Sequence, residues 1–180
     1  DTDPDDDHDR IWGYNYALTG NSDHLKLTFH LNASSLFVST KMPSSRATVD
    51  LRSLQSGYPI SPVADAVLAA GVEAWEPLCA DVTLSDLNNA SRAFNQETGR
   101  KVPFWSISAG YRIWLADEVG PVQSLARGVM AARLDGGTLL AAPDHWPARR
   151  VVEAMRATLD ANNLHQLPHT PGRYQGLAPD

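Results

Sequence analysis

Hydrophobic and polar residues alternate regularly in the stretch HLKLTFHLN, residues 24–32. In an extended chain Leu25, Leu27, Phe29 and Leu31 fall on one side, and polar residues occupy the other. IWGYNYALTG before this stretch and SLFVST after it are similar in character, and turn-forming residues separate the three. The pattern predicts an antiparallel meander of half-buried strands, with its histidines on the polar face rather than in a ligand set.

Helical periodicity follows in the next part of the chain. Residues 61–76 begin with Ser-Pro, which suits a helix start, and the pattern stops at Pro77. SDLNNASRAFNQETG is predicted to be a second helix, with Ser85 as its cap and Gly99 as its end. The residues of the first helix that we expect to face the core are Val63, Val67, Leu68, Val72, Ala74 and Trp75.

Strand and helix signals alternate in the C-terminal half. VPFWSISAGYRIWLAD is predicted to be a strand with a bend at Ala109-Gly110, GPVQSLARG a short helix, and VMAARLDGGTLLAA a hairpin. A strong helix follows Pro147, with Asp144 near its cap and Asn162-Asn163 at its end. Its apolar stripe comprises Val151, Met155 and Leu159. We therefore expect one α+β domain over residues 11–164, with an antiparallel or mixed sheet and about three helices.

The net charge of −6 is concentrated at the N-terminal end. Residues 1–9, DTDPDDDHD, hold six of the 21 acidic residues, which leaves 15 acidic residues against 15 Lys and Arg elsewhere. We predict that residues 1–10 form an acidic disordered tail and that 165–180 form an irregular Pro/Gly-containing tail. The body has no basic stripe and no apolar run long enough to span a bilayer, so we expect neither a nucleic-acid partner nor a membrane.

The loop Asp144-His145-Trp146 is the first candidate for chemistry, because it lies where a strand gives way to a helix. Capping and packing account for these residues, and the chain nominates no nucleophile beyond Ser108, whose SISAG setting lacks the first glycine of a nucleophile elbow. His165 and His169 are separated by Pro168, and Cys79 is the single cysteine, so we expect no metal or cofactor. A lone cysteine, expected to be buried and inert, favours a cytoplasmic protein.

Aromatic residues suggest a different kind of function. Trp12, Tyr14 and Tyr16 share one face of the first predicted strand, and Trp114 lies in the middle strand just before two acidic residues. Exposed aromatic side chains often anchor protein interfaces. The residues that we predict for such an interface are Trp12, Tyr14, Tyr16, Trp114, Asp117 and Glu118.

Several stretches resemble the immunity protein 52 family of bacterial polymorphic-toxin systems. They are RIWGYNYALTG with LKLTFHLNASSLFVST, the helix VLAAGVEAW followed by EPLCADVT, VPFWSISAGYRIWLAD, and DGGTLLAAPD with RRVVEAMRATLDANNL. The resemblance spans roughly residues 11–164 and implies a non-catalytic protein that binds and neutralises a cognate toxin domain. The alternatives are a small hydrolase that uses Asp144, His145 and Ser108, and a structural or assembly component.

Overall fold

The computed structural model describes residues 14–35, 44–53, 61–102 and 106–168, which form seven strands and three helices. In chain order the elements are β1 (Tyr14–Asn21), β2 (Leu25–Ser35), β3 (Ser44–Ser53), α2 (Ser61–Trp75), β4 (Cys79–Thr83), α3 (Ser85–Glu97), β5 (Arg112–Ala116), β6 (Met130–Leu134), β7 (Gly137–Ala141) and α4 (Ala148–Ala161). The prediction of one α+β domain with three helices is confirmed.

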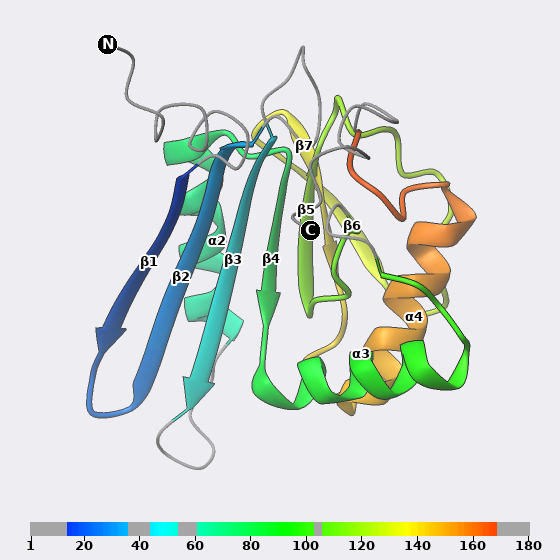
Figure 1. Cartoon of the computed structure of the whole chain (residues 1–180), viewed down its shortest axis with the longest axis horizontal. Coiled ribbons are helices and arrows are strands. Elements are labelled where there is room, and N and C mark those ends of the chain that lie inside the picture. Colours follow the sequence, from blue (N-terminus) through cyan, green and yellow to red (C-terminus); the bar gives the residue numbers. More distant parts are fainter. Residues whose placement is uncertain (1–13, 36–43, 54–60, 103–105, 169–180) are drawn as a thin grey trace, which may run out of the picture.

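The strands form one mixed sheet in the order β1-β2-β3-β4-β5-β7-β6 (Figure 1). β3 and β4 are parallel, because the chain returns through α2 between them, and the other neighbouring pairs are antiparallel. β1 and β6 are the edge strands of the described sheet.

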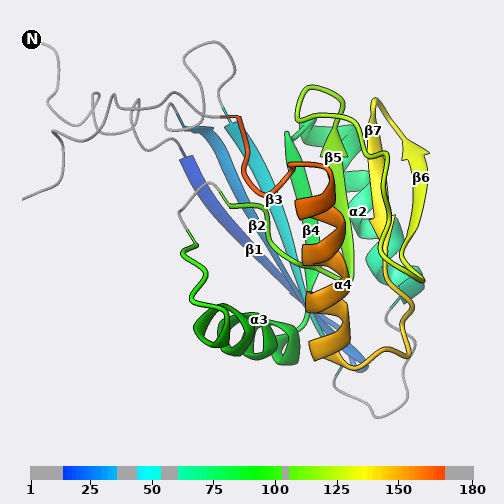
Figure 2. The same cartoon turned by 90° about the vertical axis from the view of Figure 1, so that its right-hand side faces the viewer.

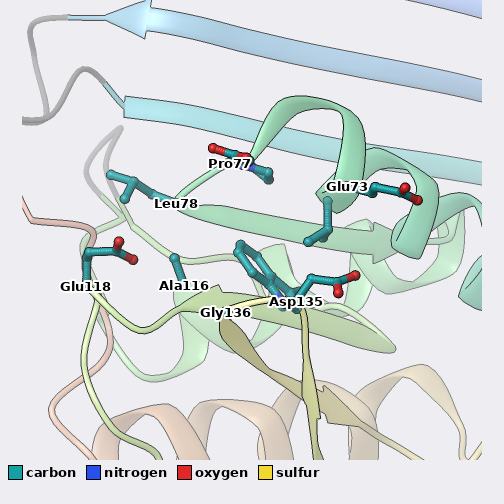
Figure 3. Close-up of a pocket in the computed structure, with 10 residues that line it drawn as sticks. Glu73, Pro77, Leu78, Ala116, Glu118, Asp135 and Gly136 are labelled. Atoms are coloured by element: carbon teal, nitrogen blue, oxygen red, sulfur yellow. The ribbon is translucent and has the colours of Figure 1, made fainter.

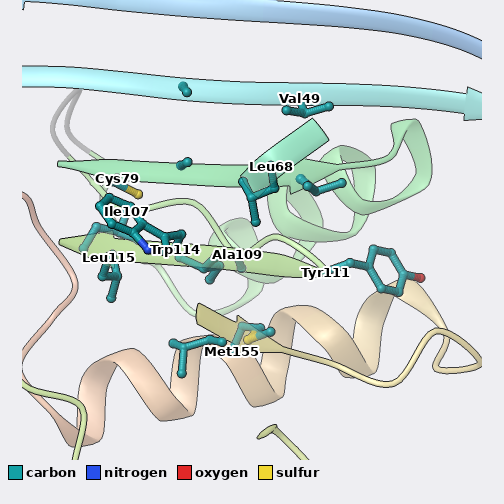
Figure 4. Packing of buried hydrophobic residues seen from close by; sticks show 14 of the residues in the cluster. Val49, Leu68, Cys79, Ile107, Ala109, Tyr111, Trp114, Leu115 and Met155 are labelled. Carbon is teal, nitrogen blue, oxygen red and sulfur yellow. The ribbon is translucent and has the colours of Figure 1, made fainter. Parts of the chain in front are cut away.

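The helices cover both faces of the sheet. α2 packs on one face, which we call the α2 face, and α3 and α4 pack together on the other, the α4 face (Figures 1 and 2). Leu68 of α2 and Met155 of α4 reach the core from these opposite faces (Figure 4). β4 and β5 are covered on both faces, so every residue of both strands is buried.

The N-terminal meander agrees with the alternation in the sequence. Leu25, Phe29 and Leu31 are buried, whereas Lys26 and His30 are exposed. Residues 36–40 of the third predicted strand lie outside the described residues. The strand beside β2 is β3, Ser44–Ser53, which the sequence analysis did not predict.

The helix predicted over residues 120–128 is wrong, because this segment has no helical turn. Its amides bond to α4 instead of to its own carbonyls. Asn162 Oδ1 accepts from the amides of Gln123 and Ser124 at 2.7 and 2.9 Å, and Thr158 Oγ1 accepts from that of Ala126 at 3.0 Å. Side chains at the C-terminal end of α4 thus satisfy amides of this segment without a helix.

Two predicted helix caps are also wrong. Leu84, not Ser85, is the N-cap residue of α3, and Pro147 is that of α4. Asp144 accepts a hydrogen bond from Nη2 of Arg112 at 2.9 Å. The C-terminal end of α4 is as predicted, with Asn162 as C-cap and Asn163 at a φ of 57°.

The hairpin between β6 and β7 is confirmed. Asp135 and Gly136 have φ values of 39° and 71°, as a two-residue type I′ turn requires. In the segment predicted to be a tail, Leu167 is buried and Gln166 forms a β-bridge with Ser106, so residues 165–168 pack on the domain. No helix in the described part of the chain is long and apolar enough to cross a membrane.

Candidate binding surface

Exposed apolar side chains gather beside β1 on the α2 face. Tyr16 and Leu18 of β1 are 57% and 60% exposed, and Trp75, in the last turn of α2, is 43% exposed. The Trp75 ring stacks on Phe29, with the ring centroids 4.7 Å apart, and Phe29 is paired with Leu18 in the β1–β2 register. These three exposed residues, Tyr16, Leu18 and Trp75, form what we call the apolar patch.

The apolar patch exists because α2 lies over the middle of the sheet. The helix packs on β3 and β4, two and three strands in from the β1 edge. Side chains of β1 that point to the α2 face therefore extend past the helix into solvent. Trp75 was expected to face the core and is instead partly exposed, and Ala74 is exposed as well, since Ala64, Leu68 and Val72 form the buried side of α2.

A pocket of about 460 Å³ lies on the other side of the last turn of α2. Its apolar lining comes from Val72, Pro77, Leu78, Trp114 and Ala116. Four acidic residues surround this lining, namely Glu73, Glu76, Glu118 and Asp135. Figure 3 shows Glu118 at one end of the pocket and Glu73 and Asp135 at the other, with Ala116 between them. We call this cavity the acidic pocket.

Three separate elements bring these carboxylates together. Glu73 lies in α2, and Glu76 follows the helix, where its amide donates to Val72 O at 2.9 Å. Glu118 lies in the turn after β5, and Asp135 lies in the β6–β7 turn. The amide of Asp117 donates to Gly136 O at 3.0 Å, which holds these two turns side by side. The order of β5 and β7 in the sheet thus brings Glu118 and Asp135 to the same pocket.

The backbone of Glu76 is unusual. Its φ is 42°, a left-handed conformation in which a side chain other than that of glycine is disfavoured. Such positions concentrate at functional sites. Here the conformation ends α2 and places an acidic residue at the pocket.

The apolar patch and the acidic pocket are parts of one surface. Val72, Glu73 and Glu76 line the pocket, and Trp75, within the same turn of chain, belongs to the patch. The end of α2 is therefore a ridge with apolar side chains on one flank and carboxylates on the other.

The structure distributes the predicted interface residues unevenly. Tyr16 lies in the apolar patch and Glu118 at the acidic pocket. Trp114 is only 2% exposed and lines the pocket, with its Nε1–H donating to Leu134 O at 2.7 Å, so it does not project as an anchor. Asp117 is exposed and forms a two-point ion pair with Arg133 at 2.6 and 2.7 Å, which lowers the pKa of its carboxyl.

The other two predicted residues give less information. Trp12 lies outside the described residues, and Tyr14 is the first residue of β1. The sequence alone did not indicate Leu18, Glu73, Glu76 or Asp135 as residues of this surface. The available signal was the pair Glu73 and Glu76, three residues apart, at a helix end that also carries an aromatic residue.

The residues of the hydrolase alternative are held by different arginines. Asp144 is bound by Arg112, which also donates to Asp65 of α2 at 2.7 Å on the α2 face. Ser108 accepts a hydrogen bond from Arg46, which is paired with the buried Asp81 at 3.3 Å on the α4 face. The sheet separates the two arginine clusters.

The loop that carries Asp144 and His145 joins a strand to a helix and is packed in place. Trp146 is buried, its carbonyl accepts from the Tyr111 hydroxyl at 3.0 Å, and the Arg150 guanidinium lies 4.1 Å from its ring centroid. His145 is exposed. The contacts of Trp146 therefore fix the path of this loop against the domain.

Arg46 and the buried Arg156 also bind carbonyl groups of the irregular backbone before β5. Arg46 donates to Ser106 O at 3.2 Å, and Arg156 donates to Ile107 O at 2.7 Å. Burial lowers the pKa of Arg156 to about 10. Burial also raises the pKa of Cys79 to about 12, which keeps this thiol protonated and unreactive. Among the described residues no group of His, Cys, Asp and Glu is arranged to hold a metal ion.

Comparisons with models of known families, with curated proteins and with solved structures found no match to this chain.

Proposed function

We propose that this chain is an immunity protein that binds a cognate bacterial toxin domain and neutralises it without catalysing a reaction. We place this activity in the cytoplasm of the cell that makes the toxin. The observation that carries the proposal is the surface around the end of α2, where the apolar patch adjoins the acidic pocket.

The composition of this surface suits a protein partner. Interfaces combine a desolvated centre, enriched in Tyr and Trp, with a polar or charged rim. The apolar patch would form the desolvated centre, and the carboxylates of the acidic pocket would form the charged rim. The resemblance of the sequence to the immunity protein 52 family supports the same function.

Electrostatics add a preference for a basic partner. The acidic pocket has four acidic residues and, among its described lining residues, no Lys or Arg. The acidic residues 1–9 add charge of the same sign. A negative surface speeds the encounter with a basic toxin and opposes acidic partners.

The proposal is tested with the toxin domain encoded beside the gene of this chain. Calorimetric titration is expected to show one-to-one binding that weakens with salt, and co-expression is expected to abolish toxicity. Deleting residues 1–9 should slow association at low salt and leave dissociation unchanged. No detectable heat together with unrelieved toxicity would refute the proposal.

Matched variants locate the interface. Leu18→Asp places a charge in the apolar patch and is expected to weaken binding about tenfold or more, or ~1.4 kcal/mol. Leu125→Asp is the control, because Leu125 is 44% exposed and lies outside the patch and the pocket lining. Equal affinity of the two variants for the toxin domain would show that the interface lies outside the apolar patch.

A double variant tests the hydrolase alternative. Asp144→Asn with His145→Ala is expected to bind the toxin domain with unchanged affinity, because neither residue belongs to the proposed surface. Loss of protection by a double variant that is still folded would favour a catalytic role for the loop.

A further inference from the structure

We propose that the acidic pocket receives a single lysine or arginine side chain of the partner, whose charged end lies among the four carboxylates. This inference rests on the proposed function, because it names the chemistry that the toxin presents to this surface.

Three of the four carboxylates at the pocket, those of Glu73, Glu118 and Asp135, are not neutralised by a described arginine or lysine. The acidic residues that form ion pairs with arginines are Asp65, Asp81, Glu97, Asp117, Asp144, Glu153 and Asp160. Glu73, Glu118 and Asp135 form no ion pair with any described residue. Negative charge is thus left uncompensated around a cavity, while the nearby Asp117 is neutralised by Arg133.

The lining of the pocket favours an organic cation on an apolar stem. Lys and Arg carry a chain of methylene groups that packs on apolar surface while the charged end remains among polar groups. Val72, Leu78 and Ala116 offer such a surface, and Trp114 lines the pocket with them. A volume of about 460 Å³ lies within the range of pockets that hold small groups.

A metal ion fits the same residues poorly. A metal ion needs several ligands within about 2.6 Å of one point, and the described residues contain no group of three or more acidic, His or Cys side chains so arranged. The pocket carboxylates come from α2, the turn after β5 and the β6–β7 turn, and they lie around the cavity rather than at one point in it (Figure 3). Dispersed carboxylates match a guanidinium or ammonium group, which offers several donors in different directions.

The direct test uses a hexa-arginine peptide and the full chain, followed by nuclear magnetic resonance. The peptide is expected to shift the Trp114 indole N–H and the Gly136 amide signals in a saturable way. Binding of the peptide to the acidic residues 1–9 shifts other signals and is therefore distinguished. Absence of a saturable shift at Trp114 and Gly136 would overturn the inference.

Charge-matched variants make the test specific. Glu73→Gln with Glu118→Gln removes two pocket charges and is expected to weaken the peptide shift and toxin binding about tenfold or more, ~1.4 kcal/mol. Asp23→Asn with Asp50→Asn removes the same charge outside the pocket lining and is expected to change either affinity less than about twofold. Thermal melting by circular dichroism confirms that both variants are folded. If both double variants weakened binding equally, the effect would come from net charge and not from the pocket, which would overturn the inference.

The two proposals fail in different ways. A toxin domain that does not bind, with a peptide that still shifts Trp114, would refute the immunity function and support the pocket as a cation receptor. A toxin domain that binds the pocket variant as tightly as the unchanged protein, with no peptide shift, would support the function and refute the pocket.

Discussion

Replacement of Arg112 by methionine tests whether the buried guanidinium holds α2, β7 and the loop before α4 together. Its Nε donates to Asp65 at 2.7 Å and its Nη2 to Asp144 at 2.9 Å. Its Nη1 donates to Ala142 O at 2.9 Å and to Tyr111 O at 3.2 Å. Methionine is similar in length and apolar, so it fills the space and removes every one of these donors.

The size of the expected loss of stability depends on which hydrogen-bonding groups lose Arg112 as a partner. The side chains of Asp65 and Asp144 are 49% and 56% exposed, so water replaces the lost partner and each pair contributes no more than about 1 kcal/mol. Tyr111 O keeps the hydrogen bond from the Ala142 amide. Ala142 is buried, and its carbonyl loses the Arg112 donor, which costs about 1–3 kcal/mol. We therefore expect Arg112→Met to lower the free energy of unfolding by ~3 kcal/mol.

Urea unfolding at neutral pH provides the measurement, since the midpoint shifts in proportion to the change when the slope is constant. In a domain of this size the same change lowers Tm by roughly 6–12 °C. Arg112→Lys keeps the positive charge but loses the planar set of N–H donors of the guanidinium. Its unfolding midpoint is expected to lie between those of Arg112→Met and the unchanged protein. An unfolding midpoint for Arg112→Met at or above that of the unchanged protein would refute the reasoning.

Three further predictions concern packing, pH and thiol reactivity. Gly110→Ala places a Cβ 2.7 Å from two sheet carbonyl oxygens and is expected to lower the free energy of unfolding by ~2 kcal/mol. Gly20→Ala, whose Cβ would meet no atom within 4 Å, is expected to leave the stability unchanged. Equal melting temperatures of the two variants would contradict this prediction. Arg100 lowers the pKa of Asp160, so this ion pair stabilises the fold above the ordinary Asp pKa of 3.8, and the stabilisation is lost as the pH falls through the lowered pKa. The stability of Asp160→Asn is therefore expected to approach that of the unchanged protein at acid pH. A difference in stability that stays constant with pH would be inconsistent with the ion pair. Cys79 is expected to react with a disulfide reagent at pH 8 only after urea unfolding, and fast reaction of the folded protein would show that it is accessible.

Local sequence signals predicted the elements whose stability is local. The alternation around Phe29 specifies β2, the Asp135-Gly136 pair specifies the β6–β7 turn, and the stripe that contains Met155 specifies the buried side of α4. Each signal depends on neighbours within a few residues, so the sequence displays it directly.

The elements that were missed depend on distant partners. β4 has Asp81 at its centre, a residue that opposes burial unless it is paired. Its partners, Arg46 and Thr48, lie more than 30 residues away along the chain, at 3.3 and 3.0 Å in space. The segment 120–128 is not helical for the same reason, since three of its amides bond to side chains of Thr158 and Asn162. No local pattern reports such contacts.

The candidate surface was predicted in fragments. Tyr16 and Glu118 of the predicted interface lie on this surface, but Glu73 and Asp135 join them only through the strand order. Because β5 neighbours β7 rather than β6, the β6–β7 turn lies beside the turn that follows β5. Sheet order results from the whole fold, so the pocket is not readable from the spacing of its acidic residues.

The architecture itself explains why exposed apolar side chains and an acidic pocket occur on this face of the sheet. A single described helix, α2, lies on a face that spans seven strands, and it packs on β3 and β4 near the middle. No other described helix covers this face on either flank of α2. On the flank toward β1 the uncovered side chains are Tyr16 and Leu18, and on the flank toward β5 and β7 the uncovered space is the acidic pocket. A second helix on this face would bury the patch and fill the pocket, which would stabilise the domain by covering apolar surface. The domain lacks that stabilisation at the surface to which we propose that the toxin domain binds.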